Sequence, residues 1–180
     1  QSGKIVIDGM DISQVGLKRL RSSIALIPQD PVLFSGTIRR NLDPFDTHSD
    51  QDILRALQRV RLQDIKLDSE VKERGENYSV GERQLLCFAR VLLRTNCKII
   101  LMDEATANVD TNTDLALQEM IREVFREKTV LCIAHRLDTI LGCDRIMVMD
   151  QGRVVEFDTV DALSKKKGGH FASLRREMMR

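Results

Sequence analysis

Apolar runs of strand length alternate with amphipathic stretches along this chain. Residues 24–27, 99–102 and 129–134 are short runs rich in apolar and β-branched side chains, which is typical of strands buried inside a parallel sheet. Residues 79–94 and 113–125 lie between these runs and carry apolar side chains three and four positions apart, the spacing of a helix with one buried face. This alternation predicts an α/β domain with a mostly parallel core sheet.

Weaker patterns predict the remaining elements. Residues 4–8 form a β-branched run that ends at an Asp-Gly turn signal, and residues 146–149 form another apolar run. A helix is expected over 37–42 and a second over 50–61, where Ser49 can cap the first turn. Two short helices are expected at the end of the chain.

Three polar side chains directly follow predicted strands. Asp103 and Glu104 follow the run 99–102, and His135 follows the run 129–134. The carboxyl ends of parallel strands meet at one edge of a sheet, where ligands bind. An acidic pair at such an edge suits Mg²⁺ and a reacting water, with one carboxylate near the metal and the other accepting a proton. Taken alone, the pair could instead cap the next helix, and the histidine could be structural.

Composition narrows the classes of function. Charged residues make up 31% of the chain and nearly cancel, leaving a formal net charge of +1, which argues against a nucleic-acid-binding surface. No apolar run approaches the roughly 20 residues that a membrane span needs. The 4 cysteines lie far apart without metal-site spacing, so we interpret them as reduced thiols. The run 165–167 of three lysines is interpreted as a solvated turn, because a lipid-binding cluster needs more charges.

Longer motifs resemble those of one protein family. Residues 76–84 read Glu-Asn-Tyr-Ser-Val-Gly-Glu-Arg-Gln, similar to the signature motif of ATP-binding cassette (ABC) proteins. Residues 99–104 read Ile-Ile-Leu-Met-Asp-Glu, similar to the Walker B strand of that family with its glutamate. Residues 28–34 resemble its Q-loop, 105–110 its D-loop and 134–137 its H-loop. Together these segments resemble an ABC nucleotide-binding domain.

The resemblance implies ATP and Mg²⁺ as cofactors. It implies that Glu104 promotes hydrolysis and that His135 contacts the γ-phosphate and the water. It also implies that Asp103 holds Mg²⁺ and that Gln29 reaches the metal through water. A helix that begins after Ser79 presents N–H groups suited to phosphate, and in this family that helix start clamps the ATP held by the opposite nucleotide-binding domain. The residues implied in that clamp are Ser79, Val80, Gly81, Glu82 and Asp110.

Other segments resemble one branch of the family. Residues 69–75 look like the X-loop of ABC exporters, and residues 33–45 resemble subfamily C, the multidrug resistance-associated proteins, whose second nucleotide-binding domain keeps an intact catalytic glutamate. Tyr78 and Glu82 depart from the commonest signature, which has Leu and Gln there. The expected fold is a phosphate-loop NTPase-like ABC ATPase domain over 1–180. Its helical signature subdomain would cover approximately 37–95, and the remainder would form a RecA-like core.

The phosphate-binding loop of the family has no counterpart in these residues. Gly3-Lys4 continues with Ile5 rather than Ser or Thr, and no glycine lies five residues before Gly3, so this is not a Walker A motif. We therefore expect the domain to be truncated upstream of Gln1. The chain alone would then bind MgATP poorly.

The leading hypothesis is part of an ATP-driven exporter of amphipathic or organic-anion substrates, placed at the cytoplasmic face of a membrane. Its partners would be transmembrane domains and a second nucleotide-binding domain in the same polypeptide, with no nucleic acid and only indirect membrane contact. One alternative is a non-catalytic cassette fragment that docks on a partner nucleotide-binding domain and regulates it. Another is a soluble cassette ATPase of translation or DNA repair. The X-loop-like segment, and the path from Gln29 to Ser79 without an inserted coiled coil, argue against this last alternative.

Overall fold

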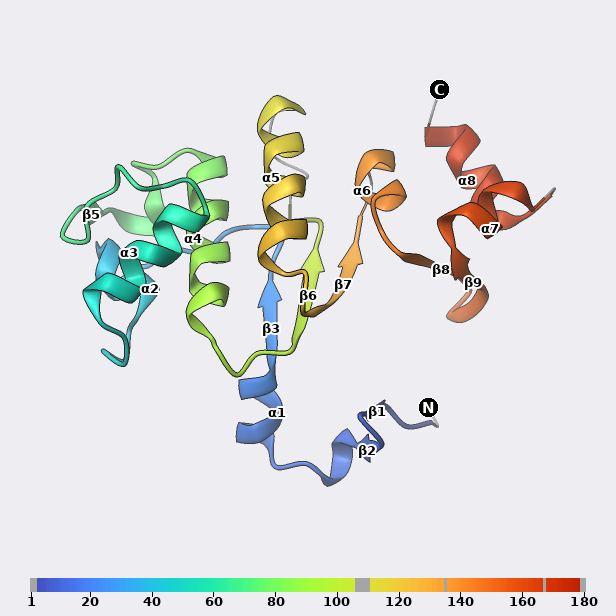
Figure 1. Cartoon of the computed structure of the whole chain (residues 1–180), viewed down its shortest axis with the longest axis horizontal. Coiled ribbons are helices and arrows are strands. Elements are labelled where there is room, and N and C mark those ends of the chain that lie inside the picture. The colour runs from blue at the N-terminus through green and yellow to red at the C-terminus, as the bar shows by residue number, and fades with distance from the viewer. Residues whose placement is uncertain (1–2, 106–110, 135, 167, 179–180) are drawn as a thin grey trace. The chain divides into compact units, whose positions relative to one another are not determined.

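The chain folds into two compact units, Gln1–Ile133 and Ala134–Arg180, as seen in a computed structural model (Figure 1). The structure describes residues 3–105, 111–134, 136–166 and 168–178. None of the helices in these ranges combines the length and apolar character needed to cross a bilayer.

The first unit is organised around a parallel three-stranded sheet. Strands β3 (Ile24–Ile27), β6 (Ile99–Asp103) and β7 (Thr129–Ile133) lie side by side in the order β3-β6-β7. Ile24 pairs with Ile99, and Ile99 pairs with Thr129, so all three strands start level and run in the same direction. The predicted parallel strands are therefore confirmed, and their carboxyl ends meet at one edge.

One face of this sheet packs into the main core. Ala25, Ile27, Ile100 and Met102 are buried there together with Phe88. The core continues with apolar side chains of α4 (Val80–Leu93) and α5 (Thr111–Val124), whose predicted apolar spacing is confirmed. The described apolar side chains that these helices contribute to the core cluster are Leu86, Phe88, Ala89, Val91, Leu93, Leu117, Met120 and Ile121.

The opposite face of the sheet is apolar and open within the described part of the chain. Leu26, Leu131 and Ile133 alternate with the buried positions and are 61%, 56% and 61% exposed. The uninterrupted apolar run of β6 predicted a strand buried on both faces. The described residues cover only one of them, although both faces have the composition of a buried surface.

A mainly helical region lies between β3 and β6 in the sequence. It contains α2 (Ile38–Leu42), α3 (Asp50–Arg59) and α4, and it holds a two-stranded pair of β4 (Gly36–Thr37) with β5 (Glu70–Val71). Each of its three helices starts with a hydroxyl cap, in which Thr37, Ser49 and Ser79 accept a backbone N–H. Helix α3 ends two residues earlier than predicted because the chain turns at Arg61, whose φ is 61°.

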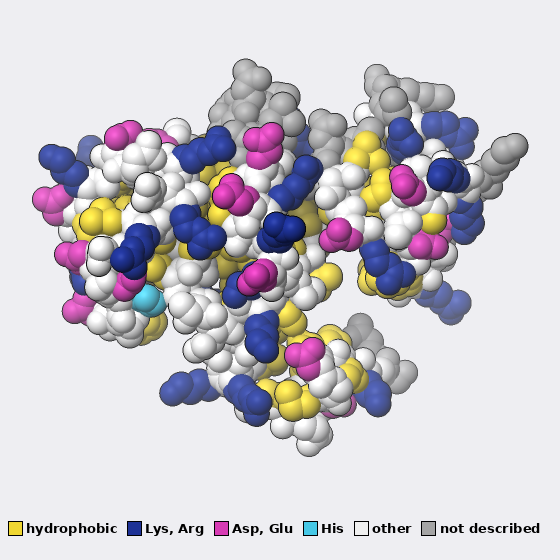
Figure 2. Space-filling model, viewed as in Figure 1, with side chains coloured by type: hydrophobic (Ala, Val, Ile, Leu, Met, Phe, Trp, Pro, Cys, Tyr) yellow, Lys and Arg dark blue, Asp and Glu magenta, His cyan; other side chains and the backbone are white. Residues whose placement is uncertain are grey.

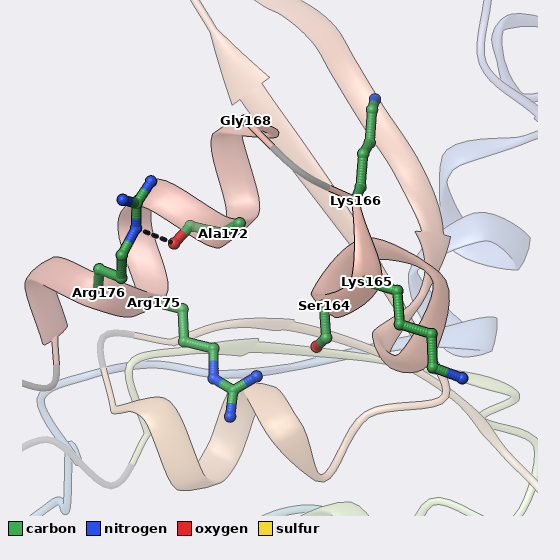
Figure 3. A pocket seen from close by; sticks show the side chains of 7 residues that line it. All are labelled: Ser164, Lys165, Lys166, Gly168, Ala172, Arg175 and Arg176. Carbon is green, nitrogen blue, oxygen red and sulfur yellow. Dashed lines mark hydrogen bonds between the residues drawn. The ribbon is translucent and has the colours of Figure 1, made fainter.

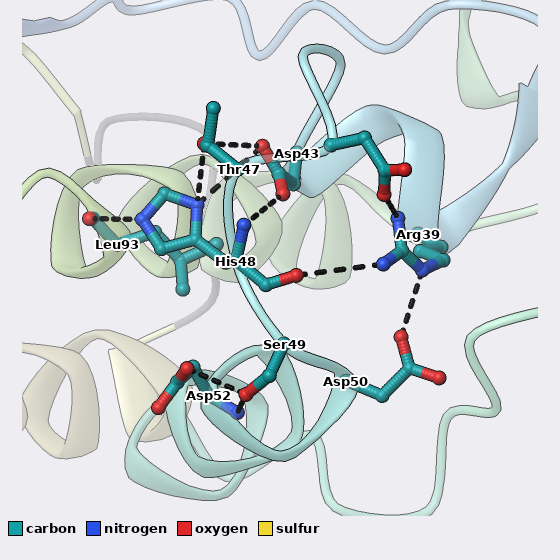
Figure 4. Close-up of polar contacts among 9 residues, drawn as sticks. Arg39, Asp43, Thr47, His48, Ser49, Asp50, Asp52 and Leu93 are labelled. Carbon is teal, nitrogen blue, oxygen red and sulfur yellow. Dashed lines mark hydrogen bonds and ion pairs between the residues drawn. The ribbon is translucent and has the colours of Figure 1, made fainter.

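A polar network ties the end of α2 to the end of α4 (Figure 4). The buried carboxylate of Asp43 accepts hydrogen bonds from the His48 amide at 2.7 Å and from the Thr47 hydroxyl at 3.0 Å. The His48 ring places Nε2 2.9 Å from the Leu93 carbonyl oxygen. Burial alone would raise the pKa of Asp43, but these bonds outweigh it and the pKa lies below its usual range. The sequence assigned no role to His48, and its contacts are those of a structural residue.

The start of the chain differs from the prediction. Instead of one strand over 4–8, it forms a hairpin of β1 (Val6–Ile7) and β2 (Met10–Asp11). The chain reverses at Asp8 and Gly9, with φ of 49° and 77°, so the turn cuts the strand short. A 3-10 turn, Ile12–Gln14, and helix α1 (Leu17–Ser23) then lead to β3.

The second unit is a hairpin covered by short helices. Its elements are α6 (Leu137–Leu141), β8 (Arg145–Asp150), β9 (Arg153–Thr159), α7 (Val160–Lys165) and α8 (His170–Met178). Val148, Leu163 and Phe171 form its small core. The predicted strand at 146–149 and the two predicted terminal helices are thus confirmed.

Candidate functional site

Two acidic side chains lie at the carboxyl end of β6. Asp103 is the last residue of the strand, pairs with Ile133 of β7 and has an exposed side chain. Glu104 donates its backbone N–H to the Ile133 carbonyl oxygen at 2.9 Å. Its φ of 45° is left-handed, a backbone conformation that L side chains rarely adopt and that is common at functional sites. The sheet edge therefore fixes both carboxylates where the sequence placed them.

Gln29 meets the same acidic pair from the neighbouring strand. It follows β3 by two residues, and its side-chain Nε2 donates a hydrogen bond to Glu104 Oε2 at 3.1 Å. The two residues are 75 positions apart in sequence. Parallel pairing of β3 with β6 brings their carboxyl ends together, so the contact follows directly from the sheet.

The donor set at this edge fits Mg²⁺ by its chemistry. Carboxylate and amide oxygens are available from Asp103, Glu104 and Gln29, and Mg²⁺ prefers oxygen ligands while keeping several waters and substrate phosphates. Within the described ranges no group of three or more His, Cys, Asp or Glu gathers as a metal site. Two carboxylates with one amide match a cation held partly by waters rather than by an all-protein cage.

A second predicted group lies at the start of α4. Ser79 caps the helix, and its Oγ accepts the Glu82 N–H at 3.2 Å. In return, Glu82 Oε2 accepts the Ser79 amide and hydroxyl, both at 2.8 Å, which completes a capping box. Val80 and Gly81 form the first turn between them. The acid that departs from the commonest signature therefore occupies the electropositive end of the helix.

Helix α4 also holds the segment that carries Gln29. The buried Gln84 side chain donates to the Pro28 carbonyl oxygen at 3.4 Å, directly before Gln29. Arg90 donates to the Val32 carbonyl oxygen at 2.6 Å and to the Asn41 carbonyl oxygen at 2.6 Å. Burial lowers the pKa of Arg90. These contacts link the signature helix to the candidate Q-loop.

The segment before α4 is joined to the helix start by short contacts. Asn77 accepts the Lys72 N–H at 3.0 Å and donates to the Glu70 carbonyl oxygen at 2.8 Å. The Tyr78 hydroxyl donates to the same Glu70 carbonyl at 3.3 Å, and burial, followed by the Glu82 charge, raises the pKa of Tyr78. The residue that replaces the commonest Leu thus anchors the candidate X-loop to the signature.

The backbone of Gly75 packs tightly against the side chains of Leu33 and Arg83. Its φ is 71°, and a Cβ placed there would lie 2.7 Å from Leu33 Cδ1 and 3.0 Å from Arg83 Cδ. Only glycine accommodates both the left-handed backbone and this packing. The residue therefore locks the candidate X-loop between the Leu33 segment and helix α4.

The residues that hold the site segments in place were not predicted from the sequence. Two predicted site residues, His135 and Asp110, lie outside the part of the chain that the structure describes. Gln84, Arg90 and Asn77 were not singled out, because their partners are backbone carbonyl groups that side-chain patterns do not reveal. A polar side chain on the apolar face of a predicted helix, as at Gln84, is the signal that could have found one of them.

Comparison with known proteins identifies the class to which this fold and site belong. The sequence profile of the ABC transporter family matches residues 1–107. The fold is similar to that of a bacterial Atm1-family ABC exporter with ATP bound, with a TM-score of 0.89, 36% sequence identity, and coverage of 99% of this chain and 32% of that one. The chain belongs to the ABC transporter family and has the ABC ATPase fold.

The similar curated proteins lie in one branch of that family. The chain is 54% identical over 178 residues to multidrug resistance protein mrp-7 of Caenorhabditis elegans, covering 96% of this chain and 12% of that protein. It is 48% identical over 182 residues to ATP-binding cassette sub-family C member 4 of Homo sapiens, covering 98% of this chain and 14% of that protein. The resemblance to subfamily C is therefore confirmed, and the chain spans about an eighth of the length of these relatives.

Proposed function

We propose that this chain contributes to ATP hydrolysis that drives export across a membrane, as part of a subfamily C transporter. The observation that carries the proposal is the contact of Gln29 with Glu104 beside Asp103, at the carboxyl ends of adjacent parallel strands. Family membership supports ATP as the nucleotide. Amphipathic or organic-anion substrates and a position at the cytoplasmic face of a membrane belong to the same proposal.

The side chains at the sheet edge divide the chemistry between them. Asp103 and the amide oxygen of Gln29 would hold Mg²⁺, which when bound neutralises charge on the phosphate oxygens. Glu104 accepts a proton from, or orients, the attacking water. The Gln29 amide holds Glu104 Oε2 from one side, so movement of the Q-loop segment changes the orientation of the carboxylate. We assign His135 to the γ-phosphate and the water on the family resemblance alone.

The helix start at Ser79 serves a second nucleotide-binding domain in this proposal. Ser79, Val80, Gly81 and Glu82, with Asp110, would contact the ATP held by that partner domain. Transmembrane domains would contact the candidate Q-loop and X-loop. The contacts of Gln84, Arg90, Asn77 and Gly75 support a concerted movement of these loops with the signature helix.

Glu104→Gln in the intact transporter tests the catalytic assignment. The amide keeps the shape of the side chain but cannot accept a proton, so ATP should still bind while turnover at this site falls by at least about 10²-fold. Single-turnover hydrolysis and nucleotide trapping measure the two steps separately. Glu119→Gln, an exposed change on α5, is the matched control. Unchanged turnover in Glu104→Gln would show that another group activates the water.

A non-catalytic docking module remains the second candidate. It is favoured by one observation: Ser79, Val80 and Gly81 form a capped helix start that is separate from the acidic pair at the end of β6. In that case the chain binds a partner nucleotide-binding domain through Ser79, and only when the partner holds ATP. Capture of a purified partner domain with and without ATP tests this candidate, and equal capture in both conditions contradicts it.

A further inference from the structure

The last residues of the chain carry a concentrated positive charge. Residues 160–180 contain six Lys or Arg and two acidic residues, although the whole chain has 28 basic and 27 acidic residues. The preceding residues are therefore net acidic. Figure 2 shows Lys and Arg side chains gathered over α7 and α8 on the visible face of the second unit. The sequence alone predicted a solvated turn at 165–167, because a lipid-binding cluster needs more than three charges.

The fold brings the basic residues of α8 next to the lysine run at the end of α7. A pocket of about 430 Å³ lies between α7 and α8, and basic residues from both helices line it (Figure 3). Its lining residues are Ser164, Lys165, Lys166, Gly168, Ala172, Arg175 and Arg176. No acidic residue is among the described residues that line it. Lys166 is paired with Glu156, which leaves Lys165, Arg175 and Arg176, from both helices, as the lining basic groups without an acidic partner among the described residues.

A buried acid, Glu156, holds residues beside this pocket. Glu156 of β9 accepts the Phe171 N–H at 2.9 Å and pairs with Lys166 Nζ at 2.9 Å. The hydrogen bond from the Phe171 amide, reinforced by Lys166, lowers the pKa of Glu156. Gly169 passes so close that a Cβ there would lie 2.7 Å from Glu156 Oε1. Glu156 therefore holds Lys166 at the end of α7 and Phe171 in the first turn of α8.

The half-buried Arg175 has the chemistry for a phosphate group. Its side chain makes no hydrogen bond or ion pair with another described residue, and it lines the pocket together with Ser164 of α7 (Figure 3). A guanidinium binds phosphate oxygens in a bidentate manner, and a hydroxyl can add a further hydrogen bond. Lys165 and Arg176 are exposed at the rim and can turn toward an anion.

We propose that the pocket between α7 and α8 binds a ligand bearing phosphomonoester groups, with Arg175 as its main contact. Arg175 and Ser164 bind the phosphate oxygens, and Lys165 and Arg176 add charge at the rim. Lys166 stays on Glu156 and sets the position of the α7 end. The same chemistry is present in a soluble inositol phosphate and in a phosphoinositide headgroup.

Two probes distinguish these sources. Calorimetric titration with inositol 1,4,5-trisphosphate tests the soluble ligand. Co-sedimentation with phosphatidylcholine vesicles containing phosphatidylinositol 4,5-bisphosphate tests the lipid, against phosphatidylserine vesicles of equal charge. Binding to either phosphorylated probe supports the proposal and identifies the source. The proposal is overturned if inositol 1,4,5-trisphosphate does not bind and the phosphoinositide vesicles bind no better than the phosphatidylserine vesicles.

Variants assign the binding to the pocket. Arg175→Gln combined with Lys165→Gln should weaken binding by about tenfold or more, because it removes a bidentate contact and a rim charge. Ser164→Ala, which leaves every charge in place, should weaken binding less. Lys18→Ala combined with Arg19→Ala removes two exposed charges from α1 and should leave binding unchanged. If this control variant lost as much affinity, the ligand would be attracted by the overall surface charge and not by the pocket. Unchanged thermal unfolding verifies that each variant is folded.

Discussion

At the scale of single residues, Glu82 has a role that its departure from the common signature does not reveal. Its carboxylate receives the hydroxyl and the amide of Ser79, the groups that we propose for nucleotide contact. A phosphate that approaches this helix start must displace or face a negative charge. The capping box thus stabilises the helix start while competing with the ligand proposed for it.

Glu82→Gln should therefore strengthen the response to ATP in the intact transporter. The amide keeps an acceptor for the Ser79 amide but removes the charge, an effect of ~1 kcal/mol near a helix N-terminus. The ATP concentration for half-maximal turnover should fall by about fivefold. Steady-state hydrolysis over a range of ATP concentrations measures this half-maximal concentration. The Ser79→Ala variant is measured in parallel.

The two variants separate the competing explanations. A weakened ATP response in Ser79→Ala with no change in Glu82→Gln means that Ser79 meets nucleotide without competition from the acid. No change in either variant means that this helix start does not contact nucleotide at all.

At the scale of elements, Arg90 fastens α4 to the segment between β3 and α2. Arg90→Met removes hydrogen bonds to two carbonyl groups and to the buried Asn41 side chain. Leaving such groups unpaired should lower the free energy of unfolding by ~2–4 kcal/mol. Urea unfolding measures this loss. Arg122→Met, on the exposed side of α5, should change the free energy of unfolding by less than about 0.5 kcal/mol. An equally small change in Arg90→Met would contradict the role of Arg90 in joining α4 to this segment.

Sequence patterns predicted the elements where local signals agreed. The strands β3, β6 and β7 follow from their apolar runs, and the Ser79 cap follows from its position before an amphipathic stretch. The place of Gln29 near the acidic pair came from the family resemblance alone, and parallel pairing of β3 with β6 is its physical reason. The turn at Asp8-Gly9 was signalled, but the second strand of the hairpin was missed because Met10–Asp11 is too short to show a strand pattern. The anchoring role of Tyr78 was missed because its partner is a backbone carbonyl.

At the scale of the whole molecule, the described residues leave apolar side chains exposed on one face of the sheet of the first unit. Leu131→Thr should reduce binding of a hydrophobic dye and self-association of the 180-residue chain, with little loss of stability, because Leu131 is 56% exposed. Val130→Thr, one residue away on the packed face, should cost ~1–3 kcal/mol because it buries a hydroxyl. Dye fluorescence, light scattering and urea unfolding measure these effects, and equal stability losses would contradict the assignment of the two faces.

The parallel sheet also determines when its strands can pair during synthesis on the ribosome. Among the described strands β3 pairs with β6 alone, and Ile99, the partner of Ile24, is made about 75 residues later. At translation rates of roughly 5–20 residues per second, this delay lasts about 4–15 s. During it, Ile27, which ends fully buried, lacks its partner in β6. Nascent chains stalled before residue 99 should therefore recruit chaperones more strongly than chains stalled after β7.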